Sequence, residues 1–427
     1  MSIKKTLLKN SSINLLGYGY LLLLSFFAIP MLLKSLGADT FGVYLVYAGL
    51  IPLASTLNFG LTTALVRYLS LPSMSKHKKT LYWQTCLWQF TVLSLAVFLL
   101  SLLINLLVIN KLVPVSLLTS ILISLIIFVN HLSQPFQTLP QVDQNFAFYN
   151  LRNLIVGTGT TILTAFLALY YPSLPHIFAF QLVLHIITGL VFFKYATNKF
   201  TGKNVWPKFS RPASNKLINF GFKNFIGSLA SQLRNQFSKF ALAGMLNPQA
   251  VTIFTIPQTI IIKAAGAISQ LTLSFFPLST SLSSKQRIGK LQKLILGIQG
   301  LVLFLGILQV YVVHQFGLSF LIFWLKDVDL ATKGFSVLKI LSIFFVLTSL
   351  TPIPSVVLDG INKPQIPSMF AVTSAVLNII LIFLLTPKYG FLGPAYATTI
   401  SSIVVAPLFL ITFTVIFKRY KYKLTHD

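Results

Sequence analysis

Apolar segments long enough to cross a lipid bilayer recur from one end of the chain to the other. A transmembrane helix needs about 20 predominantly apolar residues. Twelve segments meet this requirement, and they are centred near residues 23, 54, 96, 127, 160, 184, 232, 266, 302, 346, 376 and 405. Because lipid cannot hydrogen bond to the backbone, an isolated apolar segment of this length must form a helix. The sequence therefore predicts an all-α polytopic membrane protein with 12 transmembrane helices.

The composition agrees with this prediction, because only 9% of the residues are charged and the mean hydropathy is +0.81. A soluble protein of this length would expose far more charge. The basic N-terminal stretch "MSIKKTLLKN" is similar to the start of a signal peptide. The apolar segment after it is too long and has no small-residue cleavage site. We therefore expect this segment to be retained as the first span.

Basic residues predict the topology, because cytoplasmic loops of membrane proteins carry an excess of Lys and Arg. If the N-terminus is cytoplasmic, 21 of the 33 Lys and Arg lie in inward segments, five in outward loops and seven within the spans. Both termini are therefore predicted to be cytoplasmic. The net charge of +27, with only six acidic residues, favours attraction to anionic membrane lipids. We expect no nucleic-acid partner.

The longest predicted inward connection, from Lys194 to Lys216, divides the chain nearly in half. A shift of 210 residues superimposes Asn14 on Asn224, which suggests a duplication. Each half has an even number of spans, so the halves would be parallel repeats with a binding region between them, as in carriers. The predicted domains are a six-helix lobe over residues 1–197, a basic linker over 198–215 and a second six-helix lobe over 216–427.

The seventh predicted span is unusually polar on one side. A helical wheel places seven polar residues on that side, namely Ser231, Gln232, Arg234, Asn235, Gln236, Ser238 and Lys239. Leu233 and Phe237 lie on the opposite side. Hydrocarbon cannot satisfy so many polar groups. We therefore predict that this helix lines a water-filled cavity, together with Asn14 and Tyr18 of the first span.

Cations within the spans suggest what the cavity binds. Arg234 is predicted near the midplane and Lys263 deep in the eighth span, where the sequence offers no acid to pair with them. Lys239 lies nearer the outer end and could extend to the interface, and Arg152 lies only a few residues into the fifth span. Cations without counter-ions favour an anion, and the planar guanidinium matches phosphate oxygens. Nearby Ser, Asn and Tyr side chains are candidates for sugar hydroxyls, although such residues also form ordinary contacts between helices.

Two segments carry a resemblance to a known family. The first is "LKSLGADTFGVYLVYAGLIPLASTLNFGLTTALVRYLS", residues 33–70, and the second is "DGINKPQIPSMFAVTSAVLNIILIFLLTPKYGFLGPAYATTIS", residues 359–401. They resemble the bacterial polysaccharide-unit flippases, which form the polysaccharide transport family of the multidrug/oligosaccharidyl-lipid/polysaccharide (MOP) exporter superfamily. Asn58 departs from the pattern, because an acid commonly precedes Phe-Gly-Leu in this family.

The resemblance implies two six-helix lobes around a central cationic cavity in a bacterial inner membrane. It implies transport of an undecaprenyl-diphosphate-linked oligosaccharide, an O-antigen or capsule repeat unit, from the cytoplasmic to the periplasmic leaflet by alternating access. A polysaccharide polymerase and a chain-length regulator would be its partners, and no cofactor or metal is expected. The predicted substrate-binding residues are Arg234, Lys239, Lys263 and Arg152 for the diphosphate or an acidic sugar, and Asn14, Tyr18, Ser231 and Asn235 for hydroxyl groups.

Two other classes of function remain open at this stage. A multidrug exporter of the same superfamily would share the fold, but one that carries cations needs acids in its cavity. A membrane-embedded glycosyltransferase, polymerase or ligase needs catalytic groups on a sizeable outward loop. The longest outward stretch, residues 314–333, is short and mostly apolar. We find no metal-ligand cluster, phosphate-binding glycine loop or nucleophile triad, and an enzyme is therefore not expected.

Overall fold

The computed structural model describes residues 3–200, 205–282, 288–361 and 363–426, and every regular element in these ranges is helical. All twelve predicted span centres lie within helical segments. Nine helical stretches of the described ranges are long and apolar enough to cross a membrane, and one of them, Gln365–Tyr422, has 58 residues. At 1.5 Å per residue, that stretch is long enough for two crossings. The all-α membrane fold is confirmed, and the helices are compatible with twelve crossings.

The chain forms two compact units. Unit 1 comprises Met1–Gly19 and Phe237–Asp427, and unit 2 comprises Tyr20–Gln236. Two long helices, α1 (Ile3–Ser55) and α9 (Arg211–Met245), contribute residues to both units. The predicted lobe limits at residues 197 and 216 stay a prediction.

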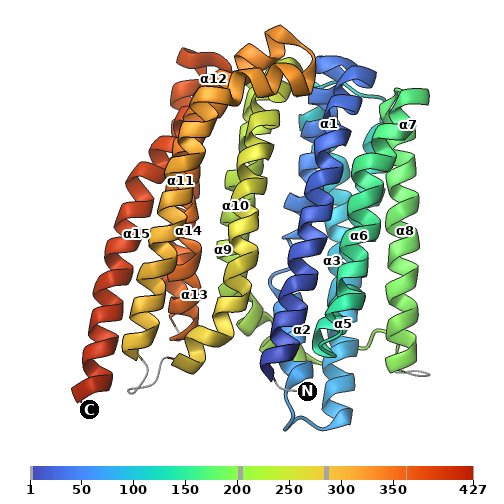
Figure 1. Ribbon diagram of the computed structural model, residues 1–427. Coiled ribbons are helices and arrows are strands. Elements are labelled where there is room, and N and C mark those ends of the chain that lie inside the picture. Colours follow the sequence, from blue (N-terminus) through green and yellow to red (C-terminus); the bar gives the residue numbers. More distant parts are fainter. Residues whose placement is uncertain (1–2, 201–204, 283–287, 362, 427) are drawn as a thin grey trace. The chain divides into compact units, whose positions relative to one another are not determined.

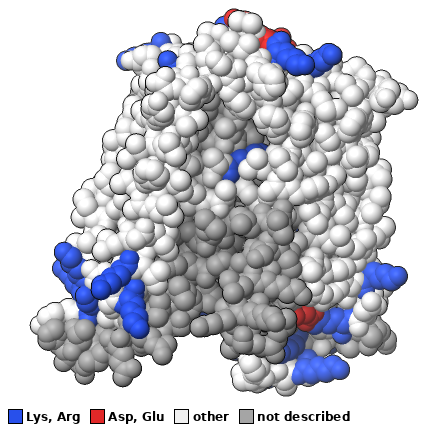
Figure 2. Space-filling view, viewed as in Figure 1, with Lys and Arg blue, Asp and Glu red and all other residues white. Residues whose placement is uncertain are grey.

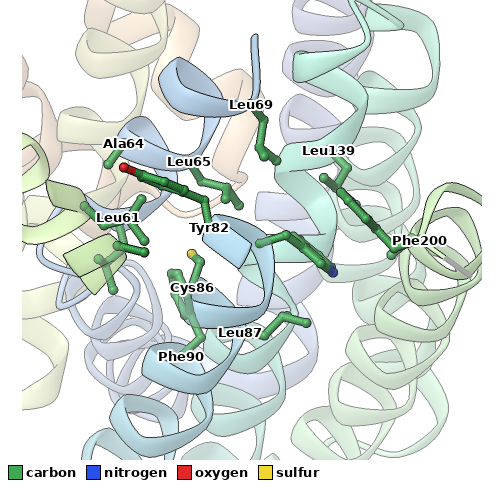
Figure 3. Close-up of a cluster of buried hydrophobic side chains, with 14 residues drawn as sticks. Leu61, Ala64, Leu65, Leu69, Tyr82, Cys86, Leu87, Phe90, Leu139 and Phe200 are labelled. Carbon is green, nitrogen blue, oxygen red and sulfur yellow. The ribbon is translucent and has the colours of Figure 1, made fainter. Parts of the chain in front are cut away.

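Unit 2 contains the remainder of α1 and the elements up to the middle of α9 (Figure 1). Its other elements are α2 (Leu61–Ser70), α3 (Lys76–Ile104), η1 (Asn105–Ile109), α4 (Asn110–Leu112), α5 (Leu117–Val142), α6 (Phe146–Thr158), η2 (Gly159–Leu163), α7 (Thr164–Tyr170) and α8 (Leu174–Lys199). Helix α5 is central, because it packs along both α3 and α8. Figure 3 shows a hydrophobic core of this unit. In this core Trp83 stacks on Phe200, with ring centroids 5.0 Å apart. Cys86 is fully buried in the same core.

Helix α1 has one internal kink and ends in an unwound turn. Gly37 has φ of 73° and kinks the helix, and the chain unwinds between Ser55 and the start of α2, where Gly60 has φ of 69°. This unwound turn approaches α9 closely, because a Cβ at Gly221 would lie 2.6 Å from the Gly60 carbonyl oxygen. Only glycine fits at that approach. Discontinuous helices of this kind are tolerated in membranes where protein groups satisfy the freed backbone.

The segment before α9 packs on α3. The Lys208 N–H donates to the Gln84 carbonyl at 3.2 Å, and the Thr85 hydroxyl donates to the Lys208 carbonyl at 3.3 Å. The rings of Trp88 and Phe209 lie 4.6 Å apart. This part of the predicted basic linker is therefore attached to unit 2.

Unit 1 contains α10 (Pro248–Leu282), α11 (Ile288–Leu325), α12 (Val328–Ser349), α13 (Pro352–Gly360), α14 (Gln365–Tyr389), η4 (Gly390–Leu392) and α15 (Gly393–His426). Helix α12 packs along α10, α11 and α15, and α14 packs along α15. Leu291 of α11 belongs to one hydrophobic core of this unit, together with Val357 of α13 and Phe413 of α15. The first residues of α1 also belong to this unit, because the Tyr18 hydroxyl donates to the Lys263 carbonyl at 2.6 Å. Figure 1 shows the start of α1 and the end of α15 at the same end of the unit.

Candidate functional site

Unit 2 contains a cavity of about 540 Å³ among its helices. We call it the unit 2 cavity. It is lined by the second half of α1, the unwound turn after it, and residues of α2, α5, α6, η2, α8 and α9. Its volume lies in the range of small-molecule binding sites, about 300–1,000 Å³.

Arg152 of α6 supplies a guanidinium to the described lining of this cavity. Its Nη2 donates to the Asn130 Oδ1 at 3.0 Å, and its Nη1 lies 3.5 Å from the Asn153 Oδ1. The Arg152 Nε is buried and has no hydrogen-bond partner among the described residues. Asn130 is itself fixed, because its Nδ2 donates to the Ser55 Oγ at 2.7 Å. The guanidinium is therefore oriented by neutral amides and retains a donor without an acceptor in the described ranges.

The unwound turn beside the cavity is held by amide side chains. Asn58 donates through Nδ2 to the Gln134 Oε1 at 2.8 Å and accepts the Gly60 N–H at 2.9 Å. Gln134 donates in turn to the Ser55 carbonyl at 2.9 Å. Asn58 thus acts as donor and acceptor together. A carboxylate cannot donate, which gives a physical reason for the amide at this position.

A wide turn shapes another part of the cavity wall. The element η2 is a π-helical turn, a form that often occurs at functional sites. The Gly159 carbonyl accepts the Thr164 N–H across the wide turn and also accepts the Thr164 hydroxyl at 2.8 Å. Thr160, within the turn, lines the cavity, as do Gln181 and His185 of α8.

The described lining of the cavity contains no Asp or Glu. Asp143 of the same unit is engaged elsewhere, because it pairs with Lys199 and accepts the Tyr195 hydroxyl at 2.8 Å. Removing an unbalanced cation from water is costly. The cavity therefore has the chemistry to hold an anion, with the fork of Arg152 as donor.

The other predicted cations, and the predicted hydroxyl-binding residues Tyr18, Ser231 and Asn235, are not part of the described lining of this cavity. Arg234 and Asn235 are half-buried on α9 in unit 2, and Lys239 and Lys263 are half-buried in unit 1. Ser231 is exposed, and its hydroxyl donates to the Gly227 carbonyl at 2.9 Å. The Tyr18 hydroxyl is used in its hydrogen bond to the Lys263 carbonyl. The side chain of Asn14 lies outside the described residues.

One expectation from the helical wheel is wrong. Ser238, predicted on the water-facing side of α9, is 0% exposed. The end of α9 is enclosed, because Ala241 packs with Ile382 of α14 and Ala397 of α15. Earlier on the helix, Gln232 does line the unit 2 cavity, as does Ser228 one turn before it.

Sequence reasoning did not select Asn130, Gln181 or Ser55 as site residues. Each is a polar residue within a largely apolar span, and that was the available signal. It is weak, because most such residues make ordinary contacts between helices. His131, the neighbour of Asn130, is such a case, since both ring nitrogens contact protein groups, the Ser94 hydroxyl and the Leu57 carbonyl. No group of three or more potential metal ligands occurs in the described ranges.

Comparison with known proteins decides the family. The polysaccharide biosynthesis protein family matches residues 7–283, well over half of the chain. The chain belongs to this family. The proposed O-antigen transporter of Shigella flexneri is 23% identical over 417 residues, and the match covers 94% of this chain and 96% of that protein. The predicted resemblance is thereby confirmed.

Solved structures show the fold of this polysaccharide biosynthesis protein. An inward-facing multidrug resistance transporter of the MATE family, within the MOP superfamily, aligns with a TM-score of 0.73 at 15% identity, covering 99% of this chain and 96% of its own. The lipid II flippase MurJ, in an inward closed conformation, aligns with a TM-score of 0.69 at 16% identity. The alignment covers 95% of this chain and 89% of the MurJ chain. At these identities the similarity establishes the fold alone. The chain therefore has the fold of MOP superfamily transporters.

Proposed function

We propose that the chain is a flippase for an oligosaccharide linked to undecaprenyl diphosphate, an O-antigen or capsule repeat unit. It moves this cargo from the cytoplasmic to the periplasmic leaflet of a bacterial inner membrane by alternating access. The family and the Shigella flexneri relative support polysaccharide transport. The single observation that carries the proposal is Arg152, a cation fixed by neutral amides in a cavity whose described lining has no acid.

This arrangement suits the head of the cargo. A diphosphate carries charge that hydrocarbon cannot solvate, and sugars carry many hydroxyl groups that would each lose hydrogen bonds to water. Arg152 supplies a guanidinium for phosphate oxygens. The amide and hydroxyl groups around it, including Gln181, Ser228 and Gln232, supply donors and acceptors for sugar hydroxyls.

The remaining predicted residues belong to the same proposal. Arg234, Lys239 and Lys263 are proposed as further cations for the diphosphate or an acidic sugar, and Asn14, Tyr18, Ser231 and Asn235 as groups for sugar hydroxyls. The two six-helix lobes and the cytoplasmic location of both termini are proposed with them. A polysaccharide polymerase and a chain-length regulator are the proposed partners, because an exported repeat unit must be joined to others.

Deletion of the gene tests the proposal. We expect the completed repeat unit on undecaprenyl diphosphate to accumulate, as measured by mass spectrometry of lipid-linked oligosaccharides, with the unit accessible only on the cytoplasmic side. Accumulation of single exported units without polymer would assign the chain to polymerisation instead. Unchanged lipid-linked oligosaccharides, with increased sensitivity to cationic drugs, would assign it to drug export.

A further inference from the structure

A second cavity lies on the surface of unit 1, and its described lining includes none of the residues used above. It is an open groove of about 560 Å³ along one face of α11. We call it the α11 groove. Its described lining consists of Lys290, Lys293, Leu294, Gly297, Ile298 and Leu301.

The groove exists because α11 has one packed face and one face left open. Ile288, Leu291 and Ile295 are buried against α13 and α15. On the open face, a Cβ added at Gly297 would meet nothing within 4 Å. A neighbouring helix therefore does not force a glycine at position 297, and glycine weakens a helix. The missing side chain of Gly297 leaves a notch between Leu294 and Leu301.

One end of the groove is basic. Lys290 and Lys293 are exposed and lie about one turn apart on α11. Neither takes part in an ion pair of the described ranges, where the pairs are Lys199 with Asp143 and Lys333 with Asp329. Figure 2 shows Lys and Arg gathered at the end of unit 1 where α11 begins and α15 ends. This end of the groove attracts negative charge.

The length of the groove sets the size of its ligand. Leu301 is the eleventh residue after Lys290, which corresponds to about 16 Å along a helix. The hydrocarbon core of a bilayer is about 30 Å thick. The groove therefore spans about one leaflet, with its cations at the headgroup level and its apolar part at the level of the chains.

We propose that the α11 groove binds one anionic phospholipid. Lys290 and Lys293 hold the phosphate, and one acyl chain lies in the notch formed by Leu294, Gly297 and Leu301. A phospholipid fits better than a polyprenyl carrier, because its chain ends within one leaflet whereas the longer carrier would extend beyond the groove. The inference is independent of the transported substrate.

Thermal unfolding of the purified full chain in neutral detergent tests this inference, with phosphatidylglycerol or phosphatidylcholine added. Phosphatidylglycerol should raise the melting temperature more than phosphatidylcholine does, and native mass spectrometry should detect one tightly bound molecule. Gly297→Leu should fill the notch and remove this binding. Gly300→Leu is its matched control, because Gly300 is on the same helix, has the same open surroundings and does not line the groove.

The lysines are tested separately, so that a folding defect of Gly297→Leu does not decide the result. Lys290→Gln with Lys293→Gln should weaken phosphatidylglycerol binding by about thirtyfold, whereas Lys326→Gln, at the opposite end of α11, should change it little. Equal stabilisation by both lipids would overturn the proposal. So would a groove that binds undecaprenyl phosphate in preference to phosphatidylglycerol, or a dimer of the chain that Gly297→Leu dissociates.

Discussion

Tyr18 and Tyr20 lie two residues apart on α1, yet their hydroxyl groups hydrogen bond in different compact units. Tyr18 donates to the Lys263 carbonyl at 2.6 Å in unit 1, and Tyr20 accepts from the Thr158 hydroxyl at 3.2 Å in unit 2. Gly19, between them, is the last residue of the N-terminal segment of unit 1. Helix α1 therefore passes from one unit to the other, and a different tyrosine hydrogen bonds within each unit.

The Tyr18 contact depends on a glycine of α10. A Cβ at Gly266 would overlap the Tyr18 hydroxyl. We expect Gly266→Ala to lower the melting temperature, because overpacking typically costs about 1–3 kcal/mol. Tyr18→Ala should remove most of that additional cost in the double variant, since it removes the clashing ring. Gly17→Ala is the control, because a Cβ there meets nothing within 4 Å. Additive effects of Gly266→Ala and Tyr18→Ala would contradict the contact.

Asn58 should not tolerate replacement by a carboxylate. Asn58→Asp would place an acceptor against the Gln134 Oε1 and the Ser55 carbonyl, which both accept from Asn58 now. The expected cost is about 1–3 kcal/mol, seen as a lower melting temperature. Asn110→Asp is the matched control, because the Asn110 Oδ1 accepts the Val115 N–H and a carboxylate keeps that role. Equal melting temperatures for the two variants would show that the amide of Asn58 does not hold the turn.

Periodicity and hydropathy predicted the membrane helices well, because burial in lipid is a property of each segment by itself. The breaks in those helices were less predictable. The turn after Ser55 depends on Gly60 meeting Gly221, which is 161 residues away. No local pattern contains such a contact.

The candidate site was predictable only in part. Arg152 was selected from the sequence because a cation in a span is rare. Asn130, which orients it, was not selected, since an amide in a span has many possible partners and the sequence does not say which helix faces it. The prediction that Ser238 faces water was wrong for a related reason. A helical wheel gives the side of the helix on which a residue lies, but packing of α14 and α15 decides whether that side is covered.

Thiol labelling checks which residues of α9 face water. Cysteines introduced at Ser228 and Gln232, which line the unit 2 cavity, should react with a small water-soluble thiol reagent. A cysteine at Ser238 should not, because that position is 0% exposed. The native Cys86 is buried in the core of unit 2 and should give little background. Strong labelling at position 238 with none at 228 would contradict the placement of this helix.

Topology is checked with reporter fusions. The asymmetry of 21 inward against five outward basic residues predicts that fusions after Lys203 and at the C-terminus are cytoplasmic. A fusion after Lys326 should be periplasmic. A periplasmic signal from the fusion after Lys203, a position outside the described residues, would contradict the parallel arrangement of the two halves.

The role of Arg152 is tested by changing its charge and, separately, its partner. Arg152→Lys should keep some transport, because it retains the charge and loses the fork, at a cost of about tenfold per charged hydrogen bond. Arg152→Gln should lose most transport while reaching the membrane in normal or higher amounts, since it removes an insertion cost. Arg67→Gln is the matched control, because Arg67 lies over the Phe220 ring at 4.1 Å and does not line the cavity.

The Asn130→Asp variant tests whether Arg152 binds an anionic cargo or has only a structural role. The new carboxylate would face the Arg152 Nη2, which now donates to the Asn130 Oδ1 at 3.0 Å. The Ser55 hydroxyl now donates to the Ile51 carbonyl and accepts from Asn130. In the variant, this hydroxyl can rotate and donate to the new carboxylate instead. The resulting ion pair should leave the melting temperature unchanged or raise it, because the cation gains a counter-ion. Transport should nevertheless fall, because the same carboxylate repels an anionic cargo and occupies its donor. Surface polysaccharide and accumulated lipid-linked oligosaccharide measure transport, and membrane abundance controls for folding. A well-expressed Asn130→Asp strain with normal surface polysaccharide would remove the unit 2 cavity from the path of the cargo.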